Sequence, residues 1–229
     1  MLKNTILLTL TALVLTTACT VTEPVSKLQA YNGLYTEKPV SLLIMPPINR
    51  STNVEAKEYF HTTLNVPIAN AGYYVIPPFL SMDILKRESA YDAELFLDAP
   101  LAKFGEVFGA DMALFTLIHK WDKSSIGATV TVDVEYIIKS IHTNEVLFKR
   151  RGQVTYDTSM NLGGSGLVGA LANMAASAIN TAVTKYVDVA RACNSYTLSD
   201  LPAGTYSPTF LQDSIQNAGK DVFKVTIKK

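Results

Sequence analysis

The chain has 229 residues, of which 48% are hydrophobic and 17% are charged, so it has enough apolar material for a folded core and lacks the composition of a disordered protein. Twenty basic residues balance twenty acidic ones, and no basic run is present, which argues against nucleic acid as a ligand. The length is typical of one domain.

The first residues predict an export signal. Lys3 is followed by an apolar stretch, residues 6–15, and then by small residues that lead to Cys19. The apolar stretch is too short to remain as a membrane-spanning helix. A cysteine directly after such a leader resembles the lipobox of bacterial lipoproteins, in which the leader is removed and the cysteine carries lipid. We therefore predict a signal peptide over residues 1–18 and lipid on Cys19; the alternative is an ordinary secreted protein cut near Ala18.

The residues after the leader suggest where the protein resides. Thr20, and not aspartate, follows the cysteine, which by the sorting rule of enterobacterial lipoproteins implies the outer membrane. Residues 19–38 are polar and without periodicity, so we expect them to be a lipidated tether. If Cys19 carries lipid, Cys193 has no partner within the chain and is buried, paired between molecules, or reactive.

The first patterned segment predicts a β-strand, an α-helix and a second, parallel strand. Residues 40–45 are apolar on both faces, which is typical of a strand covered by helices on both sides. Thr52 and Glu55 have the spacing of a capping box at the start of the helix. Pro67 lies inside the helical pattern and is expected to kink or restart it. Residues 73–76 supply the returning strand.

The middle of the chain predicts two short helices and a strand. Ser81 and Asp98 are expected to cap the helices, and the second helix is expected to end at Gly109. Residues 111–118 are apolar on both faces and predict a central strand.

A β-hairpin gives the clearest pattern of the sequence. Residues 129–136 alternate strictly between apolar and polar side chains, which indicates a half-exposed antiparallel strand. A turn in which Asn144 takes a left-handed conformation leads to a partner strand over residues 146–156. Acidic side chains of the first strand are expected to pair with basic ones of the second, namely Asp133, Glu135, Lys149 and Arg151.

The last third predicts a helix and an extension. Residues 162–179 carry no charge, but apolar and polar stripes separate along Leu167 to Val189, which favours an amphipathic helix on the sheet over a membrane span. The glycine-rich residues 163–166 lack the lysine of a phosphate-binding loop. Residues 196–229 are turn-rich and end in an alternating segment that fits either an edge strand or a loose tail.

Together these elements predict an α/β fold: a single, three-layer-like domain over residues 39–195 whose mixed sheet, a βαβ unit plus an antiparallel hairpin, is flanked by helices. The C-terminal extension over residues 196–229 follows it. His61, His119 and His142 do not stand at a metal-ligand spacing, so each is interpreted as structural. We predict no catalytic residue, no metal and no cofactor.

One loop is a candidate for binding. Residues 46–51 leave the carboxyl end of the first strand, which is where binding crevices form in open α/β sheets. Two prolines restrict the loop and reduce the entropy lost on ordering it. We therefore predict that Asn49 and Arg50 contact a partner; the alternative is that they close the turn and cap the following helix.

Several motifs spread over nearly the whole chain carry a family resemblance: the lipobox, the surroundings of Trp121 and the segments MPPINRS (45–51), GYYVIP (72–77), GADMAL (109–114) and GGSGLVG (163–169). In these motifs the chain resembles a family of Gram-negative outer-membrane lipoproteins of neisserial type. More distantly, the strand followed by the PPINRS loop is similar to the fold shared by CsgG, LpoB and the N-terminal domain of TolB.

The resemblance implies a lipid-anchored, periplasmic accessory protein of an outer-membrane secretion or transport assembly, with a CsgG-like envelope lipoprotein as partner. It supplies no catalytic residues, and a homo-oligomer is left open. Two other classes are considered: a solute-binding component of a transporter, which would need a closed apolar pocket, and an envelope hydrolase, which would need a cleft with perturbed titratable groups.

Overall fold

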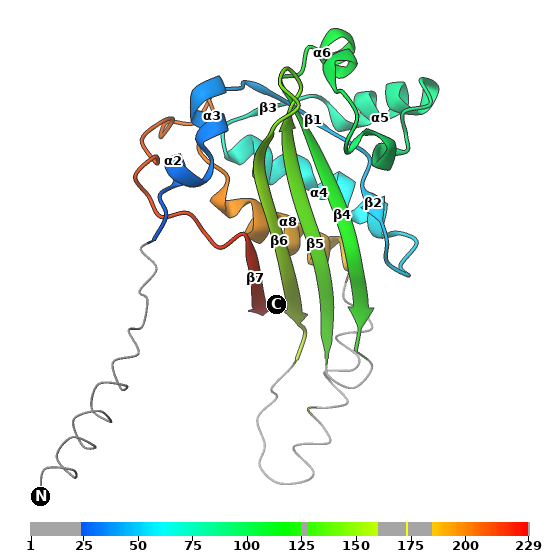
Figure 1. The fold of residues 1–229 in the computed structure, drawn as a ribbon. Coiled ribbons are helices and arrows are strands. Elements are labelled where there is room, and N and C mark those ends of the chain that lie inside the picture. The colour runs from blue at the N-terminus through cyan, green and yellow to red at the C-terminus, as the bar shows by residue number, and fades with distance from the viewer. Residues whose placement is uncertain (1–23, 125–127, 160–172, 174–184, 229) are drawn as a thin grey trace, which may run out of the picture.

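The structure, a computed structural model, describes residues 24–124, 128–159, 173 and 185–228. Its centre is a seven-stranded mixed sheet in the order β3-β1-β4-β5-β6-β7, with the short β2 paired to β4 (Figure 1). The strands are β1 (Ser41–Ile44), β2 (Ile48–Asn49), β3 (Tyr74–Val75), β4 (Met112–Lys123), β5 (Thr129–Ser140), β6 (Val146–Asp157) and β7 (Val222–Lys228). The prediction of an α/β fold with a mixed sheet is confirmed.

Helices cover both faces of the sheet (Figure 1). The core on one face lies beneath α2 (Lys27–Ala30), α3 (Asn32–Glu37), α4 (Ala56–Asn70) and α8 (Tyr186–Thr197), which is followed by η2 (Leu198–Asp200). The core on the other face lies beneath α5 (Pro78–Arg87), η1 (Ala93–Phe96) and α6 (Ala102–Phe108). None of the helices in the described part of the chain is long and apolar enough to cross a membrane.

The predicted βαβ unit is present, with β1 parallel to β3, but the start of its helix differs from the prediction. Glu55 does not form a capping box with Thr52: its carboxylate accepts a hydrogen bond from the Tyr59 hydroxyl (2.5 Å). The Asn53 side chain instead accepts from the Glu55 N–H (3.0 Å). The helix does not restart at Pro67, because α4 continues through this proline to Asn70.

The two short helices also begin elsewhere than predicted. Helix α5 begins at Pro78, a residue suited to a first helical position, and Ser81 lies inside it. Helix α6 begins after Leu101, so Asp98 is not its cap. Its predicted end is confirmed, because Gly109 has a left-handed conformation with φ of 64°.

The hairpin of β5 and β6 follows the prediction closely. Asn144 in the turn has a φ of 64°, and the strands pair from Thr129 opposite Asp157 to Lys139 opposite Val146, with one register shift after Ile138. The Arg151 guanidinium contacts the Asp133 carboxylate at 2.7 Å, and Lys149 Nζ lies 3.1 Å from Glu135. The strand predicted over residues 111–118 is β4, which extends further, to Lys123.

A buried hydrogen-bond network joins α8 to its neighbours. The Asn194 side chain donates to Thr63 Oγ1 (2.7 Å) and to the Phe60 carbonyl (3.1 Å), both on α4. Its Oδ1 accepts from the Tyr136 hydroxyl of β5. Asn194 and Tyr136 are fully buried, so the packing of α8 depends on polar groups that must all find partners. Most of the predicted helix over residues 167–189 lies outside the described residues.

Both ends of the described chain pack into the domain: the N-terminal end differs from the expected tether, and the C-terminal end has the edge strand that was one of the two alternatives. Residues 27–37 form α2 and α3, and Tyr31, which lies between them, and Leu34 of α3 are buried. The alternating C-terminal segment is an edge strand, β7, parallel to β6. Gly152 of β6 accommodates it, because a Cβ there would lie 2.3 Å from the Phe223 ring. The region of the chain that can act as a tether is therefore shorter than residues 19–38.

Candidate partner-binding site

Asn49, which we predict to contact a partner, is used by its own turn. Its Nδ2 donates to the Asn53 carbonyl (2.7 Å). Its Oδ1 accepts from the N–H of Ser51 (3.0 Å) and from Ser51 Oγ (2.7 Å). The donor and the acceptor of the amide both have local partners, as in the structural alternative, and these bonds shape the loop that precedes α4.

Arg50 is positioned differently. Its N–H donates to the Ile118 carbonyl (2.9 Å), which continues the pairing of β2 with β4. Its guanidinium does not cap α4 but forms an ion pair with Glu94 of η1 (Nη2 to Oε1, 2.5 Å). The Arg50 and Glu94 side chains are 45% and 52% exposed, so the pair holds two segments together while remaining accessible to a partner.

The two segments joined by this ion pair each present an apolar side chain to solvent. Val54, in the loop before α4, is 87% exposed, and Leu95 of η1 is 68% exposed. We call Arg50, Val54, Glu94 and Leu95 the Arg50 surface. An arginine with exposed apolar neighbours is a composition enriched in protein interfaces.

A groove of about 500 Å³ between α4 and α5 is a second candidate feature. His61 lines it and is only 8% exposed; burial lowers the pKa of the imidazole, and Lys86 adds to the effect while Glu58 opposes it. Phe79, also in the lining, is 88% exposed. The groove is therefore open to solvent and is not the closed pocket expected of a solute-binding component.

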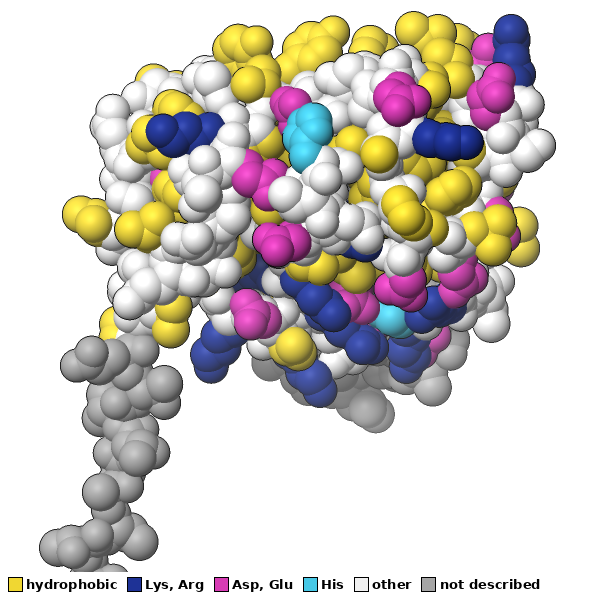
Figure 2. Space-filling view, turned by 45° about the horizontal axis from the view of Figure 1, so that its top comes forward, with side chains coloured by type: hydrophobic (Ala, Val, Ile, Leu, Met, Phe, Trp, Pro, Cys, Tyr) yellow, Lys and Arg dark blue, Asp and Glu magenta, His cyan; other side chains and the backbone are white. Residues whose placement is uncertain are grey.

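The part of the sheet that no helix of the described ranges covers carries charged side chains from β4, β5 and β6. Glu135 contacts both His119 (2.8 Å) and Lys149 (3.1 Å). Burial raises the pKa of Glu135, but these two contacts more than offset it, and the net pKa is below its usual value. Figure 2 shows basic side chains, with acidic ones between them, gathered in the lower part of the view. Within the described ranges no group of three or more His, Cys, Asp or Glu side chains could hold a metal ion.

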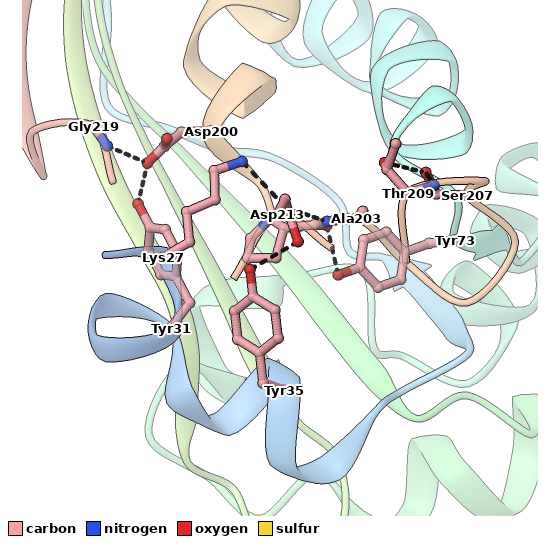
Figure 3. Close-up of polar contacts among 11 residues, drawn as sticks. Lys27, Tyr31, Tyr35, Tyr73, Asp200, Ala203, Ser207, Thr209, Asp213 and Gly219 are labelled. Carbon is pink, nitrogen blue, oxygen red and sulfur yellow. Dashed lines mark hydrogen bonds and ion pairs between the residues drawn. The ribbon is translucent and has the colours of Figure 1, made fainter. Parts of the chain in front are cut away.

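A cluster of polar side chains fastens the two chain ends to each other (Figure 3). Asp213 accepts from Lys27 Nζ (3.4 Å), the Tyr35 hydroxyl (3.0 Å) and the Ala203 N–H (2.9 Å). Asp200 in turn accepts from the Tyr31 hydroxyl and the Gly219 N–H. Burial and the hydrogen bond to Asp200 raise the pKa of Tyr31. These groups are mutually satisfied, so we interpret the cluster as structural.

Of the two cysteines, the structure describes only Cys193. Cys193 is a buried free thiol on α8, and burial raises its pKa, so it is not a reactive thiolate. Cys19, the predicted lipid site, and the glycine-rich residues 163–166 lie outside the described residues.

Comparison with known proteins gives the following matches. A family model described as "Putative lipoprotein GNA1162-like" matches residues 29–206. The lipoprotein NMB1124/NMB1162 of Neisseria meningitidis serogroup B is 24% identical over 156 residues, which are 67% of this chain and 72% of that protein.

The solved structures that match part of the chain include the following three. The crystal structure of lipoprotein GNA1162 from Neisseria meningitidis has a TM-score of 0.48 and 23% identity and covers 62% of this chain and 98% of its own. The PelC dodecamer from Paraburkholderia phytofirmans has a TM-score of 0.38 and 11% identity, with 65% and 90% covered. The LpoB C-terminal domain from Salmonella enterica has a TM-score of 0.36 and 14% identity, with 56% and 98% covered. Because the family model spans most of the sequence, the chain belongs to the GNA1162-like lipoprotein family.

Proposed function

We propose that this protein is a lipid-anchored, periplasmic accessory protein of an outer-membrane secretion or transport assembly, which acts by binding other proteins and not by catalysis. Membership of a lipoprotein family supports the anchored part of the proposal. The observation that carries the binding part is the Arg50 surface, where an exposed ion pair joins two segments that each expose a large apolar side chain.

The anchor is assigned to Cys19, directly after the apolar leader. Each buried methylene of an acyl chain contributes about 0.8 kcal/mol, so several chains hold a protein on a membrane almost permanently. Cys19→Ser is expected to release the protein from membranes or to leave an uncleaved precursor. A variant that fractionates and migrates like the wild type would contradict the assignment.

The binding role is tested by Arg50→Ala in the native lipoprotein, extracted in mild detergent and purified with its bound proteins. We expect the bound proteins to be lost while the melting temperature stays unchanged, since an exposed ion pair contributes little to stability. A CsgG-like lipoprotein among the proteins bound to the wild type would support the proposed partner.

Arg87→Ala is the matched control. Arg87 forms an ion pair with Asp83 at 2.8 Å and its side chain is 76% exposed, so this variant removes an exposed arginine pair from the same helical layer but outside the Arg50 surface. Equal capture of partners by the wild type and both variants, or equal loss in both variants, would exclude the Arg50 surface as the binding site.

A further inference from the structure

The outer edge of β7 is an unpaired strand edge. Strand β7 is the last in the sheet order, and no strand in the described ranges pairs with its outer side. It has seven residues without proline, glycine or a recorded register shift. A long, regular edge of this kind is a template for pairing with another strand. We propose that it pairs, antiparallel, with β7 of a second copy of this chain.

The backbone groups of β7 have the phase that such pairing requires. The Arg151 N–H donates to the Asp221 carbonyl (2.7 Å), and in a parallel ladder the bonds continue at alternate residues. Phe223, Val225 and Ile227 therefore direct their backbone groups to β6. Val222, Lys224, Thr226 and Lys228 direct theirs outward, where no backbone group of the described residues pairs with them, and there they can form a ladder with the second copy.

The charges of the strand disfavour the two registers next to the one centred on Val225. In a two-fold pair centred on Val225, Lys224 lies opposite Thr226 of the second copy, and Lys228 lies opposite Val222. A pair centred on Lys224 places two Lys224 side chains opposite each other, and a pair centred on Thr226 places Lys224 opposite Lys228. Like charges directly opposite are unfavourable, so the register centred on Val225 is favoured.

The same register completes an apolar face. Phe223, Val225 and Ile227 alternate with exposed residues, are partly buried and pack against the core cluster beneath α8. When Val225 faces its own copy, each Phe223 faces an Ile227 across the new ladder, so apolar surface left at the edge of one core is covered by the other.

The two-fold symmetry of this dimer is compatible with a lipid anchor near the N-terminus of each copy. The two-fold axis is perpendicular to the sheet, so both copies present the same face to the same side. The core cluster on the face of α4 and α8 includes residues of α2 and α3. Two lipid anchors that precede α2 can therefore enter a single membrane.

Two substitutions at Thr226 are expected to change the affinity of the dimer in opposite directions. Thr226 is exposed, so either variant is expected to fold. In the proposed register Thr226→Glu places two carboxylates opposite Lys224 side chains and Thr226→Lys places two lysines there. We expect the dimer dissociation constant, measured on the full chain by sedimentation in detergent, to be about tenfold lower for the glutamate variant than for the lysine variant. A wild type that stays monomeric at every concentration, or dimers that respond equally to both variants, would overturn the proposal.

Cross-linking in membranes tests the register without purification. In this register the two Val225 residues form a non-hydrogen-bonded pair with Cα atoms about 4.5 Å apart, within the range for a disulfide. Val225→Cys is expected to give a covalent dimer on oxidation. Thr226→Cys is the control, because its two copies are displaced by two residues along the strands and should not cross-link. Efficient cross-linking of the control, or none of Val225→Cys, would contradict the register.

Discussion

The buried network around Asn194 allows a quantitative prediction. Asn194→Ala leaves the Tyr136 hydroxyl, which is fully buried on β5, without its acceptor. An unsatisfied buried polar group costs about 1–3 kcal/mol. The bond to the Phe60 carbonyl is also lost, at a net cost of about 1 kcal/mol. Thr63 is less affected, because its hydroxyl still donates to the Tyr59 carbonyl at 2.7 Å. The expected loss is about 3 kcal/mol in the free energy of unfolding.

Urea unfolding followed by tryptophan fluorescence measures this loss. The chain has one tryptophan, Trp121, which is 4% exposed and packs on Phe60 with ring centroids 5.8 Å apart. It therefore reports on the packing of α4. Adding Tyr136→Phe to Asn194→Ala removes the stranded hydroxyl and should recover about 1–2 kcal/mol. Asn65→Ala, on the exposed side of α4, is the control. A cost no larger than that of the control would refute the reasoning.

Three further predictions concern the loops and the start of the sheet. Gly72 has a φ of 95°, and a Cβ there would lie 2.5 Å from the Ser207 nitrogen, so Gly72→Ala is expected to destabilise the domain by more than about 2 kcal/mol in the same urea assay; a neutral result would contradict the close contact. Burial raises the pKa of Asp111, but hydrogen bonds from Ser41 and Val40 outweigh it and the net pKa is lowered. Its stabilising contribution is therefore present at neutral pH and lost as the pH falls below about 4, and the difference in stability between the wild type and Asp111→Asn should shrink over that range; a constant difference would argue against ionised Asp111. Asn49→Ala should cost about 1–2 kcal/mol through its turn while each folded molecule retains partner binding, whereas selective loss of binding would restore Asn49 as a contact residue.

The elements predicted correctly are those whose signal is local. The period of two in residues 129–136 and the left-handed turn at Asn144 define the hairpin without reference to other parts of the chain. Helices α2 and α3 were missed although Tyr31, Leu34 and Tyr35 have helical spacing. Their helices have only four and six residues, too few to be stable alone, and their polar partners Asp200 and Asp213 lie far along the sequence.

The candidate site shows the same limit. The loop after β1 could be predicted as a binding site from the sequence because the prolines and the following helix are local features. It did not distinguish Asn49, which bonds to its own turn, from Arg50, which pairs with Glu94, because that pair joins residues 44 positions apart. The ion pair depends on how η1 packs on the sheet, and no hydrophobic pattern in the sequence indicates this contact.

The attachment of the first described residues has a consequence for reach. The Ala218 N–H donates to the Val25 carbonyl (2.8 Å), so the chain is already fastened to the domain at Val25, six residues after Cys19. With lipid on Cys19, the linker from Cys19 to Val25 has a contour length of about 20 Å. Strand β5 alone has 12 residues and is about 40 Å long. A linker shorter than the domain it holds prevents the domain from tumbling end over end at the bilayer, so it favours partners that approach along the membrane over those that diffuse in from the bulk solution.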